Sequence, residues 1–128
     1  IPEHLMTREF LEEVKAIMTD DGVLVSNTFS TSALYDHESV TYRDVFGPFF
    51  NFKMPTTGNR VIIASGSGLP SDEIIKARAE VFSARLDPYG VKIEDYPAYM
   101  DRGVDWDTTR RPLTDQYAPA NLLNSEGD

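Results

Sequence analysis

The sequence from Thr7 to Phe29, TREFLEEVKAIMTDDGVLVSNTF, predicts an amphipathic helix followed directly by a strand. Thr7 suits the N-cap position, because its hydroxyl can accept a hydrogen bond from an amide of the first helical turn. Apolar residues then recur at helical spacing between charged ones, which gives the helix one apolar face made of Phe10, Val14, Ile17 and Met18. A face of this kind is expected to pack on a sheet.

A short apolar strand follows the helix. Gly22 favours a helix end at this point, since glycine readily takes the positive φ angle with which helices commonly finish. Val23, Leu24 and Val25 then follow without an intervening polar residue. This pattern is typical of a strand that is buried on both faces, so we expect an α/β fold with a parallel, doubly covered sheet.

The residues after this strand predict a helix, an antiparallel hairpin, a further helix and an irregular tail. Gly47-Pro48 ends the first of these helices, and Pro55-Thr56-Thr57-Gly58 forms the hairpin loop. Ser71 is a suitable N-cap for the last helix. The expected elements are a helix over 32–46, strands over 49–54 and 59–65, a helix from 71 to about 86, and at most one short strand near 91–93.

Two separated segments resemble one known family. Residues 7–29 resemble the helix and fifth strand of spermidine synthase-like proteins, which are aminopropyltransferases with the class I methyltransferase (Rossmann-like) fold. Residues 112–123, PLTDQYAPANLL, are similar to the LTD-x-YAP-x-x-x-L ending of a bacterial branch whose members are often fused to membrane segments. Between them, residues 49–65 are similar to the family's final antiparallel pair of strands.

The resemblance implies that residues 1–123 are the C-terminal half of such a domain and that residues 124–128 are a disordered tail. In the family, the Gly-rich cofactor loop, the acidic residue after strand two and the catalytic Asp all precede the position that matches Ile1. The resemblance therefore places no catalytic or cofactor-binding residue here, and the isolated chain is expected to be inactive. The full protein is expected to transfer an aminopropyl group from decarboxylated S-adenosylmethionine to a diamine such as putrescine.

Four residues are candidates for substrate binding near the predicted strands. Asn27 and Thr28 follow residues 23–25, and ligands of open parallel sheets bind beyond the carboxyl ends of the strands. Asn27 equally suits a cap for the following turn. The resemblance implies that Met54 and Pro55 match an aromatic residue and a proline that line the amine pocket of the family. Methionine in place of the aromatic leaves the identity of the amine open.

Two further candidates lie in the tail. Asp115 and Tyr117 can offer a carboxylate and a phenol to an ammonium group. A purely structural clamp that holds the tail is the other interpretation of both residues.

Other motifs predict less. Residues 66–71, Gly-Ser-Gly-Leu-Pro-Ser, follow a strand and precede a helix, as a dinucleotide-binding loop does, but Ser71 replaces the third glycine and Pro70 removes an amide. An ordinary connection is favoured. The Asp-rich residues 101–107 lack the ligand spacing of a calcium loop and predict a solvated loop anchored by Trp106. His4 and His37 form no metal-binding motif, and exposed or capping roles are expected for them.

Composition limits the classes of partner. The net charge of −9 disfavours nucleic acids and anionic membranes and favours cations such as polyamines, although solubility alone also explains it. The chain has no Cys, which excludes disulfides and cysteine zinc sites and fits a reducing, cytoplasmic location. No apolar run approaches the ~18 residues of a membrane-spanning helix, so we expect no membrane contact by this segment.

The start of the chain suggests a piece of a longer protein, since Ile1-Pro2 carries no initiator methionine. In the resembling family, earlier strands pair along the free side of the strand that matches residues 23–25. Without them this strand is an apolar edge with unpaired backbone groups, so a homodimer formed through residues 23–25 is expected. A non-catalytic binding or assembly module on the same fold is the alternative function.

Overall fold

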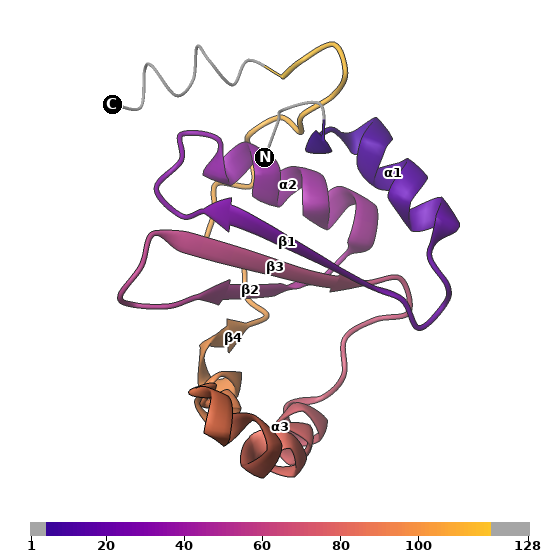
Figure 1. The fold of residues 1–128 in the computed structure, drawn as a ribbon. Coiled ribbons are helices and arrows are strands. Elements are labelled where there is room, and N and C mark those ends of the chain that lie inside the picture. The colour runs from indigo at the N-terminus through magenta and orange to yellow at the C-terminus, as the bar shows by residue number, and fades with distance from the viewer. Residues whose placement is uncertain (1–4, 119–128) are drawn as a thin grey trace.

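The structure is a computed structural model that describes residues 5–118. Helices and strands alternate in the first half, and short 3₁₀ turns dominate the second (Figure 1). In chain order the elements are α1 (Arg8–Ile17), β1 (Val23–Phe29), α2 (Tyr35–Phe46), β2 (Phe50–Lys53), β3 (Asn59–Ser65), α3 (Asp72–Leu86), the 3₁₀ turns η2 (Asp87–Tyr89), η3 (Ile93–Asp95) and η4 (Pro97–Tyr99), and β4 (Met100–Asp101).

The predicted helix starts and the hairpin are confirmed. Thr7 caps α1, with its hydroxyl accepting a hydrogen bond from the Phe10 amide at 3.3 Å, and Ser71 caps α3 in the same way. Strands β2 and β3 form the expected antiparallel hairpin. Helix α2 begins at Tyr35 rather than at residue 32, because the preceding residues form a turn in which Ser32 Oγ accepts a hydrogen bond from the Leu34 amide.

The four strands form one sheet in the order β1-β3-β2-β4, and every neighbouring pair is antiparallel. The expectation of a parallel sheet around residues 23–25 is therefore wrong for the described chain. The hairpin returns β3 alongside β1, and this leaves β1 at an edge. Because β3 runs against both β1 and β2, those two strands point in the same direction.

The expectation that β1 is buried on both faces is also wrong. Exposure alternates along the strand: Val23 is 60% and Val25 61% exposed, whereas Thr28 is buried. Only one face of β1 is covered, since α1 and α2 lie on that side and α3 lies away from β1 (Figure 1). A fully apolar triplet thus sits on a half-covered edge strand.

The main core lies between the sheet and helices α1 and α2. Leu11 is the buried side chain of α1, and Phe10 and Met18 pack against the same core as the helical spacing predicted. Ile17 was expected on this face but is 85% exposed, because it lies in the last turn of a helix that packs mainly on α2. The buried members of the core are Leu11, Val40, Tyr42, Val45, Phe46, Phe49, Ile62, Ala64 and Trp106.

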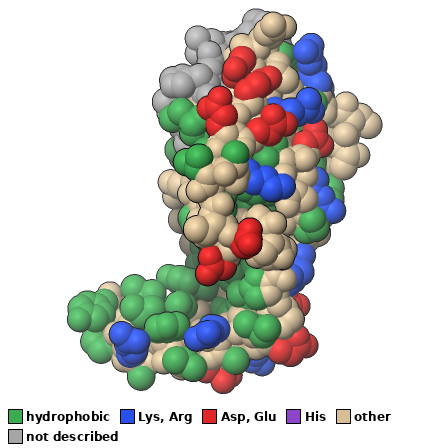
Figure 2. Space-filling view, turned by 90° about the vertical axis from the view of Figure 1, so that its right-hand side faces the viewer, with side chains coloured by type: hydrophobic (Ala, Val, Ile, Leu, Met, Phe, Trp, Pro, Cys, Tyr) green, Lys and Arg blue, Asp and Glu red, His purple; other side chains and the backbone are tan. Residues whose placement is uncertain are grey.

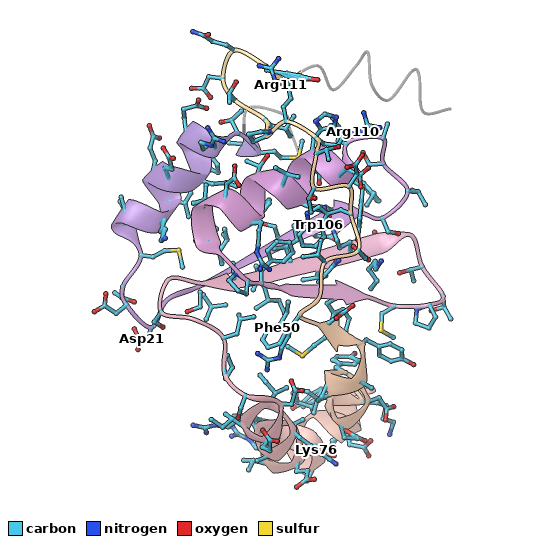
Figure 3. All side chains as sticks on the ribbon, turned by 180° about the vertical axis from the view of Figure 1, so that it is seen from behind. Asp21, Phe50, Lys76, Trp106, Arg110 and Arg111 are labelled. Atoms are coloured by element: carbon cyan, nitrogen blue, oxygen red, sulfur yellow. The ribbon has the colours of Figure 1, made fainter. Side chains whose placement is uncertain are left out.

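The second half of the chain returns to the sheet through Trp106. As predicted, Trp106 anchors its loop: its ring lies between α2 and the sheet and stacks on Phe49, with ring centroids 5.2 Å apart (Figure 3). The short strand expected near residues 91–93 is wrong. Backbone hydrogen bonds from Asp95 to Lys92 and from Tyr96 to Ile93 close 3₁₀ turns there, and the short strand that pairs with β2 is β4.

No helix within residues 5–118 has the length and apolarity that crossing a membrane requires. His4 and the predicted tail, residues 124–128, lie outside the described residues.

Replacing Trp106 with Ala is expected to lower the free energy of unfolding by about 3–5 kcal/mol, because the change removes a buried aromatic ring that stacks on Phe49. Urea unfolding followed by far-UV circular dichroism measures the loss. Tyr89→Ala is the matched control, since Tyr89 is 80% exposed and its replacement should change stability by less than about 0.5 kcal/mol. Equal losses in both variants would contradict the anchoring role.

Candidate functional site

The candidate site lies at the end of the sheet where β1 and β2 both finish. We call this end of the strands the candidate edge, which is distinct from the unpaired side of β1. Because these strands run in the same direction, the β1–α2 loop and the β2–β3 loop emerge side by side (Figure 1). The Ser30 amide and hydroxyl both donate hydrogen bonds to the Gly58 carbonyl, at 2.8 and 3.1 Å, and so fasten one loop to the other. This edge has the position at which open sheets with same-direction strands bind ligands.

Asn27 and Thr28 lie within β1 rather than past its end, which corrects their expected position. The strand continues to Phe29 because β3 pairs with it over its whole length, up to Asn59. The two side chains point to opposite faces: Asn27 is exposed, and Thr28 is 4% exposed beneath α2. Thr28 therefore belongs to the buried core, on the face of the sheet that α2 covers.

Met54 and Pro55 begin the β2–β3 loop at the same edge. Met54 is half-buried and Pro55 is exposed. The structure thus brings these two candidates to the end of the sheet that Asn27 and Thr28 approach, although they were assigned by different arguments.

Asp115 and Tyr117 lie elsewhere, against the two helices. Asp115 accepts a hydrogen bond from the Thr7 hydroxyl at 2.8 Å, and its own amide donates to Glu9 Oε2 at 2.8 Å. The Tyr117 ring lies 3.7 Å from the guanidinium carbon of Arg111. The contacts of Asp115 fasten the tail to the start of α1, and the Tyr117 ring lies 5.9 Å from the His37 ring of α2, as the clamp interpretation requires.

A buried arginine links three elements at the candidate edge. Arg60 of β3 is 0% exposed, and its guanidinium meets Glu38 Oε2 of α2 at 3.3 Å. Its Nε donates to Thr28 Oγ1 of β1 at 2.8 Å, and its Nη1 donates to the Ser39 hydroxyl. The Tyr35 ring covers it, with 4.0 Å between the guanidinium carbon and the ring centroid.

Glu38 has an unusual environment for a carboxylate. Burial raises its pKa, and the charge and hydrogen bond of Arg60 only partly oppose this effect. Desolvation penalises the ionised form, so the charge of Glu38 depends on its partner. No sequence motif predicted this pair. The available signal was Arg60 itself, a basic residue on the same strand face as the apolar Ile62 and Ala64.

A second polar cluster lies beside the first, and its Lys53–Asp105 ion pair meets solvent. The cluster consists of Tyr35, Asn51, Lys53 and Asp105. The Tyr35 hydroxyl donates to Asp105 Oδ1 at 2.7 Å, and Asn51 Nδ2 donates to Tyr35 Oη and to Asp105 Oδ1, at 3.0 Å each. The Lys53 ammonium pairs with Asp105 Oδ2. Asp105 belongs to the Asp-rich segment that was expected to be a simple solvated loop.

The ion pair between Lys53 and Asp105 shifts the pKa of both side chains. Burial alone would raise the pKa of Asp105, but hydrogen bonds from Lys53 and Tyr35 outweigh it and hold that pKa below its ordinary value. The hydrogen bond to Asp105 raises the pKa of Lys53. Both groups therefore carry their charges at neutral pH.

His37 and the Gly66–Ser71 loop make contacts that serve the fold. His37 is 6% exposed rather than exposed, and one ring nitrogen lies 2.8 Å from the Arg111 carbonyl. Within residues 5–118, no group of three His, Cys, Asp or Glu side chains is placed to hold a metal ion. In the Gly66–Ser71 loop, the Pro70 carbonyl accepts a hydrogen bond from Arg102, and Ser71 caps α3.

An apolar pocket of about 260 Å³ lies on the opposite face of the sheet. Phe52 and Ile63 line it from the sheet, and residues of α3 and the 3₁₀ turns line it from the other side. Hydrophobic side chains gather on the surface in the region of α3 (Figure 2). Phe50 points toward the same side (Figure 3). None of the predicted site residues lines this pocket.

Replacing Arg60 with Met is expected to lower the free energy of unfolding by about 3–5 kcal/mol, because Glu38 would remain buried without its partner. The double variant R60M/E38Q should lose less than the sum of the two single losses, since it leaves neither charge alone. Urea unfolding at pH 7 gives all three values. Arg8→Met, which breaks the exposed pair with Asp44, is the control and should cost less than about 1 kcal/mol. Additive losses in the double variant would show that the two charges do not stabilise each other.

The chain is similar to a curated polyamine aminopropyltransferase. The protein, from Vibrio vulnificus (strain CMCP6), is 56% identical over 124 residues, which are 96% of this chain. This chain spans 42% of the length of that relative. No protein-family model and no solved structure matches the chain. Over almost its whole length, the chain is therefore similar to a part of a polyamine aminopropyltransferase, in agreement with the resemblance of residues 7–29 and 112–123 to spermidine synthase-like proteins.

Proposed function

We propose that this chain is the C-terminal part of an aminopropyltransferase that moves an aminopropyl group from decarboxylated S-adenosylmethionine to a diamine such as putrescine. The observation that carries the proposal is the 56% identity to a polyamine aminopropyltransferase across 96% of the chain. The acceptor is inferred from the resemblance of residues 7–29 and 112–123 to the family. The isolated chain is expected to be inactive, because the family's catalytic Asp and cofactor loop precede the matching segment.

The sheet is compatible with the end of a Rossmann-like class I methyltransferase domain. In the proposed full domain, β1 follows the preceding parallel strands, and β3 is inserted antiparallel between β1 and β2. The uncovered edge of β1 would then accept the preceding strand. The candidate edge would lie beside the cofactor site, because β1 and β2 end there.

The proposed reaction is an in-line displacement. A neutral diamine nitrogen attacks the propylamine carbon next to the sulfonium; the new C–N bond forms as the C–S bond breaks, and the bonding electron pair leaves with sulfur as a neutral thioether. The attacking nitrogen then loses a proton, which the Asp upstream of this chain accepts. We infer that Met54 and Pro55, together with Asn27 on the exposed face and Thr28 on the core face of β1, build the end of the sheet that positions the amine.

A longer protein that contains these residues and the preceding half of the domain is expected to turn over decarboxylated S-adenosylmethionine with putrescine. Asn27→Ala should raise KM for the amine about tenfold, the effect of about 1.4 kcal/mol from one lost hydrogen bond. Met54→Tyr, which restores the aromatic residue of the family, should change the preference among diamines of different length. Asp44→Asn, an exposed change on α2, is the control and should leave KM for the amine and the preference among diamines unaltered.

Chromatographic detection of the aminopropylated amine measures this reaction. Absence of turnover in the longer protein, with its fold intact by circular dichroism, would contradict the proposal and favour the non-catalytic assembly module.

The free edge of β1 supports a second part of the proposal, the assembly of the isolated chain into homodimers. The strand VLVSNTF carries no charged residue and no proline, the features that usually protect an edge. Val23, Val25 and Phe29 are 60%, 61% and 55% exposed on one face. Pairing of two copies through β1 would satisfy the open backbone groups and cover these side chains.

Light scattering coupled to size exclusion is expected to give a dimer at high micromolar concentration, and Val25→Lys should shift it toward the monomer. Val81→Lys is the matched control, because Val81 is 63% exposed but lies on α3. A wild-type monomer at these concentrations, with β1 uncovered, would refute pairing through this edge.

A further inference from the structure

Lys53 holds its ammonium in surroundings that would suit a primary amine ligand. The residue ends β2, and its Nζ pairs with Asp105 Oδ2. The same nitrogen lies 5.4 Å from the centroid of the Tyr35 ring. A carboxylate together with an aromatic face is the combination with which proteins recognise ammonium groups.

The carboxylate of this cluster is held in place without the lysine. Tyr35 Oη donates to Asp105 Oδ1 at 2.7 Å, and Asn51 Nδ2 donates to the same oxygen at 3.0 Å. Asn51 Nδ2 also reaches Tyr35 Oη at 3.0 Å, which fixes the ring. Only Oδ2 of the carboxylate depends on Lys53. The receiving groups are therefore preorganised, and the cation is the one component that can be exchanged.

Asn51 also presents an unused acceptor. The residue is 1% exposed, and within residues 5–118 its Oδ1 is the buried side-chain polar atom without a hydrogen-bond partner. A buried carbonyl oxygen without a donor is unfavourable. A primary ammonium has three N–H donors; the tethered Lys53 ammonium does not bond to this oxygen, so an untethered ligand ammonium on the carboxylate could use a further donor for it.

The cluster is accessible, in contrast with the neighbouring ion pair. The side chains of Lys53 and Asp105 are 39% and 31% exposed, whereas those of Arg60 and Glu38 are 0% and 4% exposed. Lys53 can therefore swing into solvent by side-chain rotation alone. Its departure would leave Asp105 uncompensated next to water, and a ligand ammonium would restore the balance of two cations and two anions around Tyr35.

The cluster adjoins the loop assigned to the amine. Lys53 directly precedes Met54 and Pro55, and Tyr35 opens α2 immediately after the β1–α2 loop. The overall charge of −9 further favours the approach of a cationic ligand.

We propose that Asp105, Tyr35 and Asn51 bind one primary ammonium of the amine substrate, and that Lys53 occupies this position when the amine is absent. The inference rests on the proposed function, which supplies the class of ligand. Lys53 is then a specificity-determining residue, because only an amine that outcompetes a tethered ammonium enters. A diamine, which keeps a charged end while the other end reacts, satisfies this requirement.

Titration of the 128-residue chain with putrescine, followed by NMR, tests the site directly. The side-chain amide signals of Asn51 and the Cε–Hε signals of Lys53 should shift saturably. The signals of Lys92, whose pair with Asp87 has no aromatic partner among residues 5–118, are the internal control and should not shift. Sodium chloride at matched ionic strength and tetramethylammonium, which has no N–H donor, should leave Asn51 unchanged.

Three variants sharpen the test. Lys53→Met removes the competitor and should tighten the dissociation constant for putrescine at least fivefold. Asp105→Asn should weaken binding at least tenfold, and Lys92→Met should leave it unaltered. If Asp105→Asn fails to fold, Tyr35→Phe serves instead: it keeps the ring but loses the hydroxyl that orients the carboxylate, and should weaken binding several-fold.

The result separates this site from the reaction. Saturable shifts at Asn51 that tighten in Lys53→Met support the site, even if the longer protein shows no aminopropyl transfer. Equal affinity in wild type and Lys53→Met, or shifts at Lys53 that salt reproduces, would overturn the site, even if the longer protein is active.

Discussion

The arrangement of this chain depends on the ion pair between Arg60 and Glu38. Two charges without access to water are unfavourable unless each is compensated, and here the guanidinium is compensated by Glu38, Thr28 Oγ1 and the Ser39 hydroxyl together. These partners come from α2 and β1, and Arg60 itself comes from β3. The position of α2 over the sheet is therefore specified by polar contacts as well as by the apolar core beside them.

Tyr35 transmits this constraint to the surface. Its ring contacts the buried guanidinium of Arg60, and it also contacts the exposed ion pair of Lys53 and Asp105. A rigid, charge-balanced interior thus supports a cluster whose outer ion pair meets solvent. This combination suits a binding site, because the fixed groups orient the carboxylate while the exposed cation remains free to exchange.

The tail completes the structure by tying distant elements together. Asp105 and Trp106 attach it to the sheet side of α2, and Leu113, which is 0% exposed, attaches it to both helices. The Leu113 amide donates to Thr41 Oγ1, and its carbonyl accepts from the Arg8 amide, each at 2.8 Å. Asp115 and Tyr117 lie in the same C-terminal segment and contact the same two helices. Their contacts therefore favour a structural role over a role in binding the amine.

Local signals were sufficient for α1, α3, the β2–β3 hairpin and the anchoring of Trp106, because capping hydroxyls, helical spacing and turn residues act within a few positions of the chain. The similarity of residues 7–29 and 112–123 also pointed to aminopropyltransferases, and the chain is 56% identical to one of them over 124 residues. The antiparallel neighbour of β1, the burial of Arg60 and His37 and the gathering of Asp105 with Lys53 were not accessible in this way. Each depends on partners between 21 and 74 residues away, and an apolar triplet or a lone charge has the same local pattern whichever element comes to lie beside it.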